Sequence, residues 1–184
     1  PVAIVDETAD LAKAAKDISD GASFDNNIMC ISEKCIVAVE SIVPAFVKQL
    51  EENGVYYIDN ETEMLQLTKT VLNHDMKMVR KMEGKSAMDI LEEAGIHPNR
   101  PVRLVVVRTF AKHPLVLEEC LMPVVPLVAV ADFEEALETA LFTEQGYRHT
   151  AMVHSQCIDR LSKAAKIMNT TVFIKNGSSL AGIG

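Results

Sequence analysis

Two cysteines lie five residues apart in the segment GASFDNNIMCISEKC (21–35), and their surroundings differ. Cys30 follows a polar, turn-forming run, whereas Cys35 opens the apolar run CIVAV (35–39). Backbone N–H groups left free where a new helix or strand begins can activate a thiol and later hold an oxyanion. A cysteine that opens an apolar strand is usually inert core packing. Of the two, Cys30 is the candidate nucleophile, but an ordinary loop cysteine is the simpler interpretation of the spacing alone.

Other residue types that could carry chemistry form no second pattern. His149 and His154 are expected in one strand, where their spacing puts them on opposite faces, so they cannot share a metal ion. Neither a GxGxxG nor a GxxxxGK[ST] loop occurs, so no nucleotide phosphate cradle is predicted. Glu118 and Glu119 lie between apolar stretches, where a solvated turn is the simplest interpretation. We therefore expect no metal site.

Composition predicts one packed domain. The 184 residues are 48% hydrophobic, which is typical of a globular fold. The net charge of −8, without a dense basic run, argues against a nucleic acid partner. The longest nearly apolar run, 121–131, is too short to span a membrane. The four cysteines follow no disulfide or CxxC spacing, which favours a reducing compartment.

Apolar runs alternate with stretches of helical periodicity along the chain. The runs are continuously apolar rather than alternating, so both faces of the sheet should be covered. This order predicts an α/β fold with a mainly parallel sheet flanked by helices. Strands are expected at 1–5, 35–39, 102–107, 125–131, 149–155 and 170–176; helices are expected from Asp6 or Thr8 to Gly21, through Phe46 to Gly54, and from Asn60, Ser86, Asp132 and Ser155.

Four segments carry a resemblance to a known family. GASFDNNIMC (21–30) resembles the catalytic-cysteine segment of CoA-acylating aldehyde dehydrogenases, which make acetyl- or propionyl-CoA from short aldehydes. EECLMPVVPLV (118–128), GYRHTAMVHSQCIDRL (146–161) and TTVFIKNGSSLAGIG (170–184) resemble later segments of that family, in the same order and spacing. Together they span the chain from residue 21 to residue 184.

The resemblance assigns roles to particular residues. Cys30 falls on the nucleophile and Cys35 on an ordinary strand position. Glu119 falls on the glutamate that, in the wider superfamily, holds the nicotinamide ribose of NAD. Leu121 falls where a large apolar residue lines the nicotinamide.

The resemblance also implies an activity and its setting. The implied reaction converts a short-chain aldehyde, NAD and coenzyme A to acyl-CoA and NADH through a thioester on Cys30. Residues 1–184 would be the catalytic domain of a larger enzyme whose NAD-binding domain precedes them, and this chain alone would be inactive. The implied partners are aldehyde, CoA and further copies of the chain in a homodimer or higher homo-oligomer, without nucleic acid or membrane. The implied location is the cytoplasm, either free or inside a bacterial microcompartment.

Two alternatives stay open at this point. One is a hydrolytic NAD-dependent aldehyde dehydrogenase, in which water replaces CoA; the glutamate that would identify it lies upstream of the position matching Pro1. The other is a non-catalytic domain that serves only in assembly.

Overall fold

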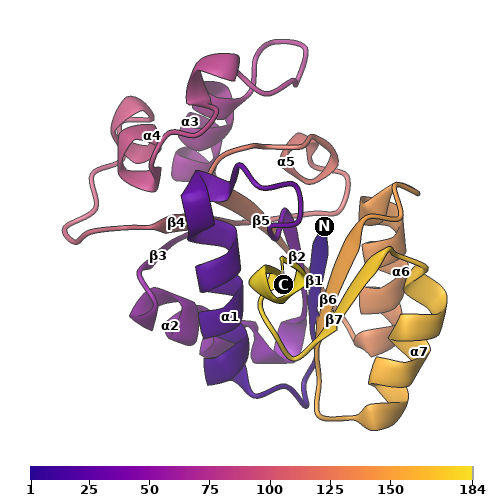
Figure 1. Cartoon of the computed structure of the whole chain (residues 1–184). Helices are drawn as coiled ribbons and strands as arrows, with labels where there is room; N and C mark the ends of the chain where they lie inside the picture. Colours follow the sequence, from indigo (N-terminus) through magenta and orange to yellow (C-terminus); the bar gives the residue numbers. More distant parts are fainter. Residues whose placement is uncertain (184) are drawn as a thin grey trace.

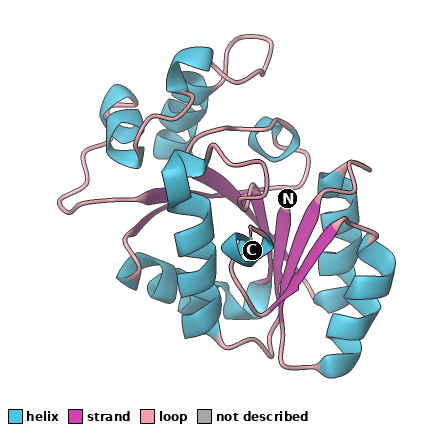
Figure 2. Ribbon diagram, in the orientation of Figure 1, coloured by secondary structure: helices cyan, strands magenta, loops and turns pink. Residues whose placement is uncertain are grey.

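Seven strands form one sheet in which every neighbouring pair is parallel. The computed structural model describes residues 1–183, and the sheet order is β3-β4-β5-β2-β1-β6-β7 (Figures 1 and 2). The expected α/β fold with a mainly parallel sheet is confirmed. The strands are β1 Val2–Val5, β2 Cys35–Val39, β3 Val55–Ile58, β4 Leu104–Thr109, β5 Val124–Val130, β6 Thr150–His154 and β7 Val172–Lys175.

Helices cover both faces of the sheet, as the continuously apolar strands require. One face packs against α1 and α2, and the other against α3 and α4 at one end and α6 and α7 at the other (Figure 1). Within β1, for example, Ala3 packs with α1 while Ile4 packs with α6. The α-helices are α1 Leu11–Ser23, α2 Val43–Glu52, α3 Glu61–Val71, α4 Ala87–Glu93, α5 Pro114–Leu117, α6 Phe133–Glu144 and α7 Ile158–Met168.

No helix among residues 1–183 is long and apolar enough to cross a membrane. Within the same residues, no three His, Cys, Asp or Glu side chains are grouped as metal ligands would be.

β1 lies between β2 and β6 and sets their register. Val2 is aligned with Cys35 of β2 on one side and with Ala151 of β6 on the other. Because all three strands run in the same direction, the residues that precede β2 and β6 lie at the same end of the sheet as the start of β1. This end, where the strands begin, carries the candidate site.

Three predicted helix starts are confirmed by their side-chain caps. Asn60, Ser86 and Asp132 each accept a hydrogen bond from the backbone N–H three residues later, which satisfies a donor that the first helical turn leaves free.

Other expected boundaries are wrong. α1 is capped by Asp10, because the Asp6 carboxylate is occupied by the Thr8 N–H and hydroxyl. α7 begins after Cys157, and the Ser155 hydroxyl accepts from the Cys157 N–H instead of capping the helix. His149 precedes β6 rather than lying within it.

Strand β3, Val55–Ile58, was not predicted. It is four residues long, and its two central tyrosines are only half-buried at the edge of the sheet. A run of four residues with two tyrosine hydroxyl groups shows little of the apolar periodicity from which strands are predicted.

Gly21 does not end α1, as the sequence had suggested, but lies inside it. A Cβ atom built on Gly21 would lie 2.7 Å from Glu33 Oε1 and closer still to Glu33 Oε2 and Ser179 Oγ. The helix therefore needs glycine here to let a buried carboxyl group approach its backbone.

We expect Gly21→Ala to destabilise the fold by about 1–3 kcal/mol, because the added methyl must displace Glu33. Helix propensity alone predicts the opposite, a gain of about 1 kcal/mol. Urea unfolding compares the two proteins. A variant more stable than the parent would contradict the close approach.

Candidate functional site

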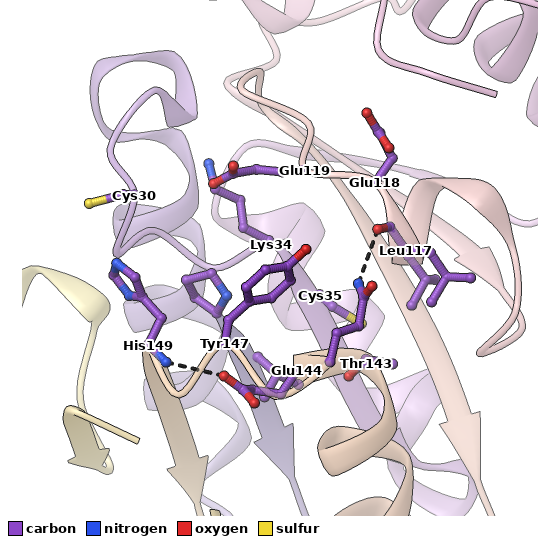
Figure 3. A pocket seen from close by; sticks show the side chains of 14 residues that line it. Cys30, Lys34, Cys35, Leu117, Glu118, Glu119, Thr143, Glu144, Tyr147 and His149 are labelled. Carbon is purple, nitrogen blue, oxygen red and sulfur yellow. Dashed lines mark hydrogen bonds between the residues drawn. The ribbon is translucent and has the colours of Figure 1, made fainter. Parts of the chain in front are cut away.

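A cavity of about 310 Å³ opens at the amino-terminal ends of the strands. Its lining comes from the residues before β2 and β6, the segment before β5 and the end of α6 (Figure 3). Ligand sites in open α/β sheets usually lie at the opposite edge, beyond the carboxyl ends of the strands. The side chains that line this cavity and could do chemistry are Cys30, Lys34, Cys35, Glu118, Glu119, Glu144, Tyr147 and His149.

The loop that carries Cys30 begins with three residues in left-handed conformation. Asp25, Asn26 and Asn27 have φ values of 46°, 51° and 63°. Short polar side chains tolerate this region better than others do, which explains the DNN sequence. The Asn27 amide holds the turn closed by donating to the carbonyl oxygens of Ala22 (2.7 Å) and Glu33 (3.1 Å).

This turn presents Cys30 at the surface of the cavity. Its side chain is exposed, and no hydrogen bond among residues 1–183 uses its sulfur. No helix begins after it, because the next regular element is β2. Of the two elements expected after the Cys30 loop, a helix or a strand, the structure has the strand.

The other cysteines have different surroundings. Cys35 and Cys120 are buried, and burial raises the pKa of each thiol to about 12. Cys157 is partly exposed but does not line the cavity. Only Cys30 combines exposure with a place in the cavity, so the sequence-based preference for Cys30 over Cys35 is consistent with the geometry.

Lys34 and Glu119 come together in the cavity from segments 85 residues apart (Figure 3). The Lys34 Nζ donates to the Asn27 carbonyl at 2.6 Å and to Asn27 Oδ1 at 2.5 Å. Burial lowers the pKa of Lys34 to about 8, and Glu119 is the strongest of the charges that oppose this shift. Sequence reasoning had singled out Glu119 but missed Lys34; its position directly before an apolar strand was the available signal.

His149 enters the cavity from the loop between α6 and β6. The Glu144 carboxylate fixes this loop by accepting from the N–H groups of Gly146 (3.0 Å) and His149 (3.1 Å). His149 Nδ1 lies 2.7 Å from Thr150 Oγ1, which orients the ring. In Figure 3 the ring lies on the Cys30 side of the cavity. His154, at the other end of β6, is buried, and burial lowers its pKa to about 4.

Leu121 lies just outside the cavity lining. Its N–H donates to Met78 Sδ at 3.3 Å, and its carbonyl accepts from the Gly84 N–H at 2.9 Å. The contact of Leu121 with a nicotinamide therefore stays a prediction.

Glu33, next to Lys34 in sequence, points the other way, into the protein. Its carboxyl group is fully buried and accepts from the Ser179 N–H at 2.9 Å and the Ser179 hydroxyl at 2.7 Å. Burial raises the pKa of Glu33 to about 7 despite these two donors. Glu33 thereby ties the Cys30 loop to the turn Ser179–Gly182.

Comparison with known proteins identifies the family. Residues 2–182 match the aldehyde dehydrogenase family. The chain belongs to this family. The whole chain is also 45% identical to the propanal dehydrogenase (CoA-propanoylating) of Salmonella typhimurium, of which it covers 39%. It thus spans about two fifths of the length of that protein.

Two solved aldehyde dehydrogenases have the same fold. The Rhodopseudomonas palustris propionaldehyde dehydrogenase with bound CoA and an acylated cysteine is 40% identical, with a TM-score of 0.96 over the whole chain and 42% of that protein. The propionaldehyde dehydrogenase of a fucose utilisation bacterial microcompartment from Clostridium phytofermentans is 37% identical, with a TM-score of 0.95 over the whole chain and 42% of that protein.

We expect iodoacetamide to modify Cys30 before the other three cysteines of the folded chain. Cys30 is exposed, whereas the thiols of Cys35 and Cys120 are buried and almost never ionised near neutral pH. Peptide mapping after brief labelling measures the order, with partly exposed Cys157 as the internal control. Earlier modification of any other cysteine would contradict this assignment.

Glu33 predicts a pH dependence of stability. The pKa of Glu33 is about 7 in the folded protein and 4.5 in the unfolded chain. The contribution of the protonated carboxyl group to the free energy of unfolding is therefore complete below about pH 4.5 and is lost as pH rises through about 7. The side chain at position 33 of the Glu33→Gln variant cannot ionise. Between pH 5 and pH 8 the free energy of unfolding should therefore fall further in the parent chain than in the variant, by up to roughly 3 kcal/mol.

Urea unfolding at both pH values measures the difference in slope, to which a constant effect of the substitution does not contribute. Equal slopes for the variant and the parent would show that Glu33 stays ionised when buried.

Proposed function

We propose that this chain is the cysteine-bearing catalytic domain of a CoA-acylating aldehyde dehydrogenase for short aldehydes. The observation that carries the proposal is the exposed thiol of Cys30 beside the cavity that Glu119 and His149 also line. The relatives support it, since the Salmonella typhimurium protein is CoA-propanoylating and the Rhodopseudomonas palustris structure has an acylated cysteine. The residues that bind the rest of NAD would lie outside residues 1–184.

Cys30 would form the covalent intermediate. Its thiolate adds to the aldehyde carbonyl carbon to give a thiohemiacetal, whose oxyanion the Cys30 backbone N–H helps to hold. Loss of hydride leaves an acyl thioester on Cys30. The proposed role of His149 is to move a proton on the same side of the cavity.

Glu119 would orient the cofactor. Its carboxylate lines the cavity, and none of the hydrogen bonds within residues 1–183 uses it, so it can accept from ribose hydroxyls. This donor and acceptor chemistry fits NAD, which would supply the hydride acceptor when bound. Leu121, which is not among the residues that line the cavity, would supply an apolar contact to the nicotinamide.

CoA would complete the reaction by displacing the acyl group from Cys30. One thioester is exchanged for another, so the step is nearly balanced and needs no general base to activate water. The Cys30 thiolate is the leaving group and is ready for the next cycle. A hydrolytic enzyme would release acid instead.

The proposed setting follows the relatives. We infer a homodimer or higher homo-oligomer that acts in the cytoplasm, either free or enclosed. The Clostridium phytofermentans relative belongs to a bacterial microcompartment, which supports the enclosed alternative.

The proposal is tested in the complete enzyme that contains this chain. Cys30→Ala should abolish formation of propionyl-CoA from propionaldehyde, NAD⁺ and CoA, because no other cavity thiol is exposed. Cys157→Ala is the matched control and should keep full activity. Thioester and NADH are measured together: acid in place of thioester would favour the hydrolytic alternative, and neither product would favour a role in assembly alone.

Glu119→Gln should lower kcat/KM for NAD⁺ by roughly 10- to 150-fold, which corresponds to the loss of a hydrogen bond to a charged group worth about 1.5–3 kcal/mol. Alkylation of Cys30 in the same variant should stay close to that of the parent, because Glu119 does not contact the thiol. Unchanged kinetics would return Glu119 to the interpretation as a solvated turn residue.

A further inference from the structure

Lys34 holds a central position in the cavity that neither the family resemblance nor the relatives' names explain. It directly precedes β2, at the middle of the sheet, and its side chain extends into the cavity between the Cys30 loop and Glu119 (Figure 3). A lysine that is largely withdrawn from water needs partners for its charge. Those partners indicate what it does.

Its first partner is the turn that carries Cys30. Asn27 is fully buried, and its side-chain amide is already used in donating to Ala22 and Glu33. Its carbonyl and Oδ1 both accept from Lys34 Nζ. Without the ammonium group, these two buried acceptors would lose that donor in a turn with left-handed backbone. Lys34 thus fixes the turn three residues ahead of the nucleophile.

Its second partner is Glu119. No ion pair within 4.0 Å joins the two side chains among the described residues, so the attraction acts across the cavity rather than through a closed salt bridge. Of the titratable groups around the ammonium, which are Glu119, Cys120, Cys30 and Glu33, Glu119 favours the protonated lysine most, and the other three act in the same direction only when ionised. A carboxylate that is attracted but not sequestered keeps its oxygens available for a ligand.

We propose that Lys34 is a positioning residue of this site: through Asn27 it fixes the Cys30 loop, and through its charge it holds Glu119 at the cavity for the ribose of the cofactor. This inference deepens the proposed function and depends on it. Lys34 touches neither the reacting carbon nor the hydride. It acts by positioning the Cys30 loop and the Glu119 carboxylate relative to each other.

The decisive experiment uses the complete enzyme and separates the charge of Lys34 from its hydrogen bond. Lys34→Gln keeps a donor for Asn27 but removes the charge, and Lys34→Arg keeps both. We expect Lys34→Gln to raise KM for NAD⁺ about tenfold, and Lys34→Arg to recover most of that change. Lys163→Met, which removes an exposed lysine that is paired with Glu134 and does not line this cavity, is the control and should match the parent.

A double variant tests whether Lys34 acts through Glu119. In the Glu119→Gln background, Lys34→Gln should change KM for NAD⁺ by less than about twofold, because the carboxylate that it holds is already neutral. Fully additive effects, or an unchanged KM in the single variant, would overturn the inference. An active parent enzyme with such results would leave the proposed function intact, whereas loss of the Cys30 requirement would refute the proposed function itself.

The parent enzyme offers a second measurement if the neutral variants do not fold. As pH rises through about 8, Lys34 gives up its proton, so KM for NAD⁺ should rise over that interval. The Glu119→Gln enzyme should lack this rise. Identical pH profiles for KM in the two enzymes would also overturn the inference.

Discussion

The parallel pairing of β1 with β2 on one side and β6 on the other is the constraint on which the site depends. Val2 fixes both registers, opposite Cys35 and Ala151. Since parallel strands begin at the same end of the sheet, Lys34 and His149, which immediately precede β2 and β6, lie on either side of the start of β1 and line one cavity. A slip of one residue in either pairing would turn a buried apolar side chain to the opposite face of the sheet, so the burial of both faces protects the register.

The segment of eight residues from Asn27 to Lys34 contains several polar side chains that are held by hydrogen bonds. The turn is strained and partly withdrawn from water, so its buried donors and acceptors need partners. The Ser32 hydroxyl is buried without one, whereas the side chains of Asn27, Glu33 and Lys34 all have partners. Asn27 bonds in three directions, Glu33 accepts from Ser179, and Lys34 returns to Asn27. Successive residues point to opposite sides: the Glu33 carboxyl group anchors the loop inside the protein while the Lys34 amine faces the cavity. The exposed thiol therefore sits on a rigid support.

Environment rather than spacing separates the four cysteines. Burial makes the pKa of Cys35 and Cys120 so high that neither is a useful nucleophile near neutral pH. Cys30 differs by its exposure and by the cavity beside it. The same burial has the opposite consequence for Lys34, whose pKa it lowers, and so brings an amine within reach of titration. Burial thus keeps two thiols protonated and brings the pKa of a lysine close to neutral pH.

The sequence by itself determined the elements whose causes are local. Apolar runs gave the strands other than β3, and the caps Asn60, Ser86 and Asp132 gave three helix starts, because a cap and its partner N–H are three residues apart. The motif around Cys30 also indicated the nucleophile through its resemblance to a family. Only the tertiary structure decided the rest. Glycine is needed at position 21 because the Glu33 carboxyl group, twelve residues away in the chain, lies against the helix there, and Lys34 shares its cavity with Glu119, which is 85 residues away. Such contacts depend on strand order and register, and no local pattern of residues encodes either of them.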